Sequence, residues 1–255
     1  MRIRPAHRDD LHALRVIAAD GGSPDGDERY FRYLAEHGRL LVADVGDVDV
    51  GDVDVGDVVG FAGSIAVDDA TMVTDMFVSS THRGRGLGSS LLGAVTEGSG
   101  TVVTFSSTHP AALALYRAAG LEPQWDLLTL RGTATGGGPE LSSGTWRHGR
   151  ADVVDHFRDL GAVVGADHVV LPATAHEGGV NVVWRLVSDH PAVDAARLLA
   201  ALPTGAPVEW SLPEPHPLST WLLDHGFAVI DRDVCCSSVG WNLGERVCSV
   251  HRGLL

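Results

Sequence analysis

The feature that most constrains the fold is a glycine-rich turn between an apolar strand and an apolar helix, within residues 75–92. The turn reads Arg83-Gly84-Arg85-Gly86-Leu87-Gly88-Ser89. Glycine tolerates positive φ and has no Cβ, so successive N–H groups of such a turn can point at one anion. The helix that follows adds the positive end of its dipole at the same place. The run therefore predicts a phosphate-binding turn in an α/β chain.

Spacing separates this turn from two other phosphate-binding motifs. A Rossmann turn needs an acidic residue at the tip of the next strand, but the strand expected over 101–107 has no carboxylate in it or directly after it. A Walker loop needs Gly-Lys followed by Ser or Thr, and the chain has no lysine. The remaining pattern, R-x-x-G-x-G entered from an apolar strand, resembles motif A of the GNAT superfamily of acetyl-CoA-dependent N-acetyltransferases.

A second motif follows at residues 109–121. Proline in its first turn and glycine at its end predict a helix there. The segment resembles GNAT motif B, N-x-x-A-x-x-x-Y followed by G-F, because Ala112, Tyr116 and Gly120 stand at the matching positions. His109 replaces the Asn of the motif and Leu121 its Phe. The alternative is an α/β domain whose glycine-rich turn has only a structural role.

The resemblance implies a GNAT fold of the α/β (α+β) class, with a mixed central sheet flanked by helices. Two neighbouring parallel strands, 72–78 and 101–107, are expected to splay apart and admit the pantetheine arm of acetyl-CoA. Tyr116 is the expected general acid, with a core aromatic as its alternative role. The residues expected to bind the cofactor are Met76, Phe77, Val78, Arg83, Gly84, Arg85, Gly86, Leu87, Gly88, Ser89 and His109, the last with a helix N-cap as its alternative role.

Asp75 is the candidate for the acceptor side of the site. Similar small-amine acetyltransferases often carry a carboxylate one residue earlier, where this chain has Thr74. Alternation along a strand sends neighbouring side chains to opposite faces, so Asp75 is not a simple substitute. Either Asp75 orients a cationic substrate or a water chain removes the proton; a solvated or capping carboxylate is the alternative.

The composition changes near residue 132 and predicts two domains. Residues 1–132 form the expected acetyltransferase domain, 133–140 a flexible Gly-rich linker, and 141–255 a second domain. The second domain repeats the strand–helix–strand–helix order of the first in faded form, as a degenerate GNAT-like half of a tandem pseudo-repeat. Ser188-Asp189-His190-Pro191 stands where the glycines would be, and Leu222 where Tyr116 would map. This half is not expected to hold coenzyme A.

Charge and cysteine usage narrow the partners. The formal net charge of −14 argues against nucleic acid and anionic membranes as partners and favours a cationic substrate. Three cysteines near the C-terminus, without metal-ligand spacing, favour free thiols and a cytoplasmic location. No signal peptide, membrane span or metal site is expected, and a GDVDV repeat within 46–60 is interpreted as an expanded hairpin tip. Self-association as a homodimer is left open.

Three functions compete at this point. The first is transfer of an acetyl group from acetyl-CoA to a primary amine, of a small molecule or a peptide N-terminus, by direct attack. The second is an acyl-CoA-binding regulatory or partner module without turnover. The third is a nucleotide-binding protein of another fold. The acceptor pocket of GNAT proteins is built from variable N-terminal helices and a hairpin, so the sequence does not name the amine.

Overall fold

The computed structural model describes residues 1–22, 28–45, 58–175, 178–244, 246–251 and 253. Most of the GDVDV repeat, residues 46–57, lies outside this range. The chain divides into two units, and we call them the first unit (Met1–Phe105, His109–Pro123 and Cys236–Gly240) and the second unit (Ser106–Thr108, Gln124–Cys235 and Trp241–Leu255). No described helix is long and apolar enough to span a bilayer.

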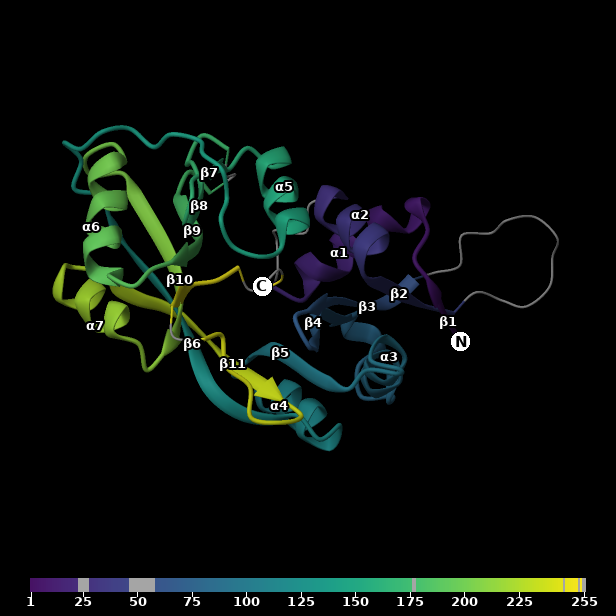
Figure 1. Ribbon diagram of the computed structural model, residues 1–255. Helices are drawn as coiled ribbons and strands as arrows, with labels where there is room; N and C mark the ends of the chain where they lie inside the picture. The colour runs from purple at the N-terminus through teal and green to yellow at the C-terminus, as the bar shows by residue number, and fades with distance from the viewer. Residues whose placement is uncertain (23–27, 46–57, 176–177, 245, 252, 254–255) are drawn as a thin grey trace. The chain divides into compact units, whose positions relative to one another are not determined.

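The first unit is a sheet with helices on both faces (Figure 1). The strands follow one another in the order β1-β2-β3-β4-β5, with antiparallel pairs up to β4 and a parallel β4–β5 pair. Its elements are β1 (Arg2–Pro5), η1 (Arg8–Asp10), α1 (Leu11–Asp20), α2 (Glu28–His37), β2 (Arg39–Asp44), β3 (Val58–Val67), β4 (Ala70–Val78), η2 (Ser80–His82), α3 (Leu87–Val95), β5 (Thr101–Ser107) and α4 (Pro110–Ala118). Helices α1 and α2 cover one side of the strands and α3 covers the other.

The apolar positions of these elements explain the layers. Helix α3 buries its leucines and Val95 against the sheet, and Phe31 of α2 packs on Phe61 of β3 with ring centroids 5.4 Å apart. Strand β3 lies between two paired strands, and nearly all of its side chains are buried. A continuous apolar run of this kind is typical of a strand that is covered on both faces. This packing fixes β4, which leads into the glycine-rich turn.

The second unit has the strand order β11-β6-β10-β9-β8-β7, with β12 paired to β9. Its elements are β6 (Glu122–Thr133), α5 (Ala151–Asp159), β7 (Val163–Val164), β8 (His168–Leu171), β9 (Asn181–Val187), α6 (Pro191–Ala201), β10 (Pro207–Glu214), α7 (Pro217–Asp224), β11 (Ala228–Ser237) and β12 (Val247–Ser249). Helices α6 and α7 lie on one side of these strands and α5 on the other (Figure 1). Trp210 of β10 is fully buried in the core of this unit, together with leucines of α6 and α7.

The unit boundaries differ from the predicted domains 1–132 and 141–255. Strand β6 follows α4 in the sequence but belongs to the second unit from Gln124 onward, where it pairs with β10. Conversely, residues 236–240 complete the first unit, where Ser238 N donates to Val102 O at 3.0 Å. Residues 124–132 therefore belong to the second unit and residues 236–240 to the first. Composition alone does not reveal this exchange of segments.

The predicted linker 133–140 is an ordered part of the second unit. Gly136 N and Gly138 N donate to carbonyls of α6, at 3.2 and 2.8 Å. A Cβ on Gly136 would lie 1.9 Å from Thr204 Oγ1, so the glycine permits a close backbone approach. The glycines that suggested a flexible linker are explained by this packing against α6.

Candidate active site

The glycine-rich turn has the backbone conformation that an anion cradle requires. Gly84 and Gly86 have φ of 76° and 79°, in the left-handed region that favours glycine. Gly86 is the N-cap of α3 and provides no capping side chain. A Cβ at either glycine would meet nothing within 4 Å, so the backbone is open to a ligand on this side. The first N–H groups of a helix have no partner within the helix, and here they are available to an anion.

Two of the remaining residues hold the turn in place, and two others are exposed. Arg83 Nε donates to Val78 O at 2.9 Å, and its guanidinium lies 3.7 Å from Asp20 at the end of α1. Arg85 and Ser89 are exposed, whereas Leu87 is buried and fixes the first turn of α3. Arg83 thus holds the turn to the strand while it still contributes positive charge at the helix start.

Strands β4 and β5 separate where the resemblance predicts. Their parallel pairing runs from Ala70 and Thr101 to Val73 and Thr104, and no pairing between them continues beyond these residues in the described chain. Residues 75–78 of β4 pair with β3 on their other side. The main-chain groups of this stretch that face away from β3 are therefore available to an extended ligand.

Met76, Phe77 and Val78, the predicted strand contacts, lie on this stretch and are all partly exposed. Phe77 stacks on Phe61 with ring centroids 5.4 Å apart. The side chain of Phe77 also approaches the end of α1 closely, since a Cβ on Gly21 would lie 2.4 Å from its ring. Its ring supports the strand, so a contribution to ligand binding has to come from its main chain.

A β-bulge changes the geometry expected around Asp75. Strand β4 pairs Asp75 with Gly63 and Val73 with Ser64, so Thr74 has no opposite residue on β3. A Cβ on Gly63 would lie 2.6 Å from Thr74 Oγ1 and 3.3 Å from Asp75 Oδ2, which places both side chains on one side. The expectation that they point to opposite faces was wrong because the bulge interrupts the alternation.

Asp75 has a partner that the sequence does not suggest. The hydroxyl of Tyr30, on α2, donates to Asp75 Oδ2 at 2.6 Å. Burial raises the pKa of the Asp75 carboxyl, against the opposing hydrogen bond from Tyr30. Burial also raises the pKa of Tyr30 well above its usual value, and the Asp75 charge adds to this effect. The pair therefore presents a carboxylate with a raised pKa, held by a neutral phenol.

Tyr116 projects from α4 into the same region of the first unit. Its side chain is buried, and burial raises its pKa to about 12, against an opposing hydrogen bond with Thr104. The Asp75 charge raises the pKa of Tyr116 further. Thr104 in turn donates to Val73 O at 2.9 Å, at the last paired position of β4 and β5. Tyr116 therefore keeps its proton at neutral pH, beside the point where the two strands separate.

His109 caps α4. Its Nδ1 accepts a hydrogen bond from Ala111 N at 3.2 Å, and Pro110 occupies the first turn. This is the capping role that the sequence leaves as the alternative to cofactor binding. The cap uses Nδ1, and cofactor binding by His109 stays a prediction.

Tyr30 and Thr104 are the two site residues that sequence reasoning missed. The sequence pattern places Tyr30 only on the apolar face of α2, and Thr104 only within a strand. The run Thr74-Asp75 offers one signal, because two adjacent polar residues interrupt the apolar positions between Met72 and Val78. In the described part of the chain, no group of three or more His, Cys, Asp or Glu side chains is arranged to hold a metal ion.

Comparisons with known proteins identify the class of the first unit. Residues 36–122 match the model of the acetyltransferase (GNAT) domain, so this part of the chain is a GNAT domain. No curated protein matches the sequence.

Solved structures extend the likeness to the whole chain. An acetyltransferase candidate from Pyrococcus horikoshii is 18% identical with a TM-score of 0.71, and the alignment covers 100% of this chain and 94% of that one. A GCN5-related N-acetyltransferase from Sphaerobacter thermophilus is 15% identical with a TM-score of 0.55, over 92% and 94% of the two chains. A phosphinothricin acetyltransferase from Sinorhizobium meliloti in complex with acetyl-CoA is 20% identical with a TM-score of 0.40, over 58% and 82%. The first two show that the chain has a GNAT fold with a mixed α/β sheet.

Proposed function

We propose that the protein transfers an acetyl group from acetyl-CoA to a primary amine, on a small molecule or a peptide N-terminus. The observation that carries this proposal is the combination, in one GNAT domain, of an open glycine turn, a separated strand pair and a buried tyrosine. Acetyl-CoA supplies a thioester that an amine can attack. The residues of this chain bind and orient the two substrates and exchange protons with them.

The donor side is supported by backbone geometry. The Gly84–Ser89 turn offers N–H groups and the positive end of α3 to the phosphates. Arg83 and Arg85 add positive charge at the turn. The guanidinium of Arg83 lies 3.7 Å from the Asp20 carboxylate and is half exposed, so this ion pair neutralises its charge only in part. The unpaired edge of β4 over 75–78 offers main-chain groups to the pantetheine arm. Bonds of this sheet-like kind would align the thioester between the two strands.

The acceptor side is supported by the Tyr30–Asp75 pair. The Tyr30 hydroxyl donates to Asp75 Oδ2 at 2.6 Å and restricts the rotation of the carboxylate. A carboxylate held in one orientation can position a cationic amine. A general base works best when its pKa lies near the working pH, and burial moves the pKa of Asp75 in that direction. We assign Asp75 to orienting the ammonium and accepting its proton, directly or through water.

Tyr116 is assigned as the general acid. Its Oη carries a proton at neutral pH, because burial raises its pKa to about 12. The thiolate of coenzyme A leaves in this desolvated place and needs a proton.

The three cysteines are free and buried, which supports the proposal of a reducing, cytoplasmic location.

The test separates binding from turnover. Acetyl-CoA should stabilise the protein against heat, and an amine panel should release free thiol that a chromogenic disulfide reports. Gly86→Ala in the turn should weaken this stabilisation, and its matched control is Gly93→Ala in α3, because an added Cβ meets no atom within 4 Å at either position. Stabilisation without thiol release across cationic and neutral amines would favour a binding module without turnover. Stabilisation by NAD or ATP in place of acetyl-CoA would refute the proposal.

A further inference from the structure

The second unit repeats the local geometry of the candidate site. Strand β9 pairs Arg185 with Val169 and Val183 with Val170, so Trp184 has no opposite residue, as Thr74 has none in β4. The β9–β10 pair is parallel, like β4–β5, and its pairing ends at Val183 and Trp210. Each unit therefore contains a bulged strand whose pairing with a parallel neighbour stops one residue before the bulge.

The helices repeat as well. His216 caps α7 through Nδ1, which accepts from Leu218 N at 3.0 Å, as His109 caps α4. At the other end, Phe227 N donates to Leu222 O at 3.0 Å, as Leu121 N donates to Tyr116 O at 2.9 Å. This bond places Leu222 at the position of Tyr116. The buried acid of the first unit is therefore a buried hydrocarbon in the second.

The separated strands of the second unit are filled by the chain itself. Strand β12 pairs antiparallel with β9, with Val247 opposite Val187 and Ser249 opposite Leu186. Ser249 Oγ lies 2.7 Å from Val183 O and 3.1 Å from Ser211 O, and so bridges β9 and β10. Val250 N donates to Ser211 O at 3.0 Å. Residues 247–250 thus make the main-chain bonds that the first unit leaves available between β4 and β5.

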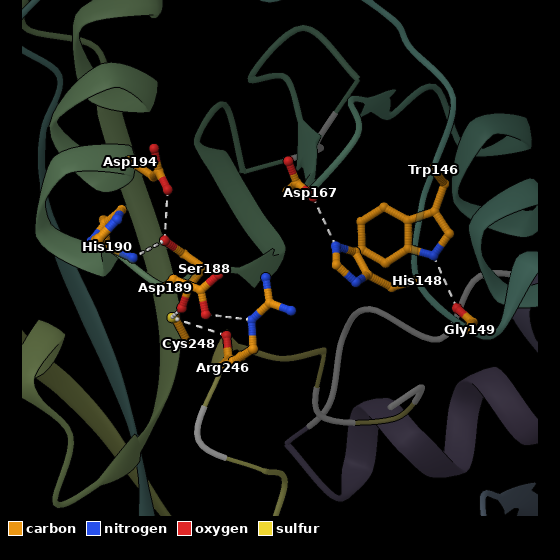
Figure 2. Close-up of polar contacts among 10 residues, drawn as sticks. All are labelled: Trp146, His148, Gly149, Asp167, Ser188, Asp189, His190, Asp194, Arg246 and Cys248. Carbon is orange, nitrogen blue, oxygen red and sulfur yellow. Dashed lines mark hydrogen bonds and ion pairs between the residues drawn. The ribbon is translucent and has the colours of Figure 1, made fainter.

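The turn before α6, which corresponds to the glycine-rich turn of the first unit, is also occupied by side chains of the second unit, as Figure 2 shows. Only residues 188–190 separate β9 from α6, against 79–86 between β4 and α3. Ser188 Oγ accepts from His190 N at 2.8 Å and donates to Asp194 at 2.6 Å, so local side chains satisfy the helix start. Asp189 pairs with Arg246 at 2.7 Å, and Ser188 N donates to Arg246 O at 2.8 Å. The carboxylates repel phosphate and tie the C-terminal strand to the turn.

The side of the bulge that holds Tyr30 and Asp75 in the first unit is filled by aromatic rings in the second. Trp184 lies 4.7 Å from Phe157 of α5 and 5.1 Å from His251, as ring centroids. These three rings occupy the side of the bulge where the first unit has its buried phenol and carboxylate.

We propose that the second unit is a copy of the acetyltransferase fold in which residues 246–251 serve as a built-in ligand, occupying the place that the donor takes in the first unit. The comparison with the donor rests on the proposed function of the first unit. The C-terminal segment completes the second unit permanently, so that the chain binds one donor molecule.

Cys248 provides a reporter on the intact protein. Cys248 belongs to β12 and is fully buried, with its Sγ 3.9 Å from Ser188 O, so a thiol reagent reaches it only when the segment leaves. Ser249→Ala removes the hydroxyl that bridges β9 and β10. We expect the labelling rate of Cys248, read by mass spectrometry, to rise at least tenfold in this variant. The matched control is Thr129→Val, which removes a 3.2 Å contact with the Ser211 hydroxyl and leaves in place the Ser211 carbonyl that the segment binds.

The internal control is Cys235, which is also buried in the second unit. Its labelling should change less than twofold in Ser249→Ala, since only the segment opens. Equal acceleration of both thiols, or the same acceleration in Thr129→Val, would show a general loosening and overturn the proposal. Labelling of Cys248 in the parent at the rate of an exposed thiol would also overturn it.

A binding measurement on the intact chain completes the test. Calorimetric titration should give one acetyl-CoA per chain, because the segment occupies the second place. Two acetyl-CoA molecules per chain would overturn the proposal. Failure of acetyl-CoA to bind at all would refute the proposed function instead, because the labelling results do not involve acetyl-CoA.

Discussion

Replacing Gly86 by alanine should weaken donor binding by an amount that the backbone sets. Gly86 has φ of 79° and ψ of 1°, and an alanine Cβ there would meet no atom within 4 Å. Steric overlap with neighbours is therefore excluded, and the cost is the left-handed conformation itself, about 1–2 kcal/mol for an L-residue. If residue 86 leaves the left-handed conformation in the free alanine variant, donor binding has to restore that conformation at this cost. Affinity for acetyl-CoA should then fall by about 5- to 30-fold.

The matched variant is Gly93→Ala in the middle of α3. Gly93 has ordinary helical φ, and its Cβ would also meet nothing, so alanine should raise the unfolding free energy by about 1 kcal/mol. Calorimetric titration with acetyl-CoA and urea unfolding measure both quantities for each variant. Unchanged affinity in Gly86→Ala, or an equal loss in Gly93→Ala, would refute the assignment of the turn to the phosphates.

Three further outcomes are expected. Tyr116→Phe should lower kcat by about 100-fold with little change in acetyl-CoA affinity, and unchanged turnover would place the acid elsewhere. Because burial raises the pKa of Tyr116 to about 12 from 10.0, the folded state binds this proton more tightly than the unfolded state. Stability should therefore fall by about 3 kcal/mol between roughly pH 10 and 12, and the part due to Tyr116 should vanish in Tyr116→Phe in alkaline urea titrations. Tyr30→Phe removes a bond that lowers the pKa of Asp75, so the acidic limb of the kcat/KM profile should move to higher pH, and an unmoved limb would remove Asp75 from the reaction.

Features that depend on neighbouring residues could be predicted from the amino-acid sequence. Positive φ at Gly84 and Gly86 follows from the absence of a Cβ, and the ends of α4 follow from Pro110 and the glycine after it. These are local preferences, so the residues alone are enough to recognise the turn, the helix and their GNAT resemblance. The strand and helix order of the second half is recognisable for the same reason.

The pairing of distant segments, in contrast, depends on the packing of each unit. Tyr30 and Asp75 are 45 residues apart, and their hydrogen bond depends on the bulge at Thr74, which is a property of the β3–β4 register. The insertion of β12 beside β9 joins segments about 60 residues apart, and β6 contributes to the second unit although it follows α4. Alternation along a strand excludes a register shift of one residue, but it does not place a bulge or choose the neighbouring strand. Those choices are made by packing of the whole unit, and they determine which separated strand pair stays open.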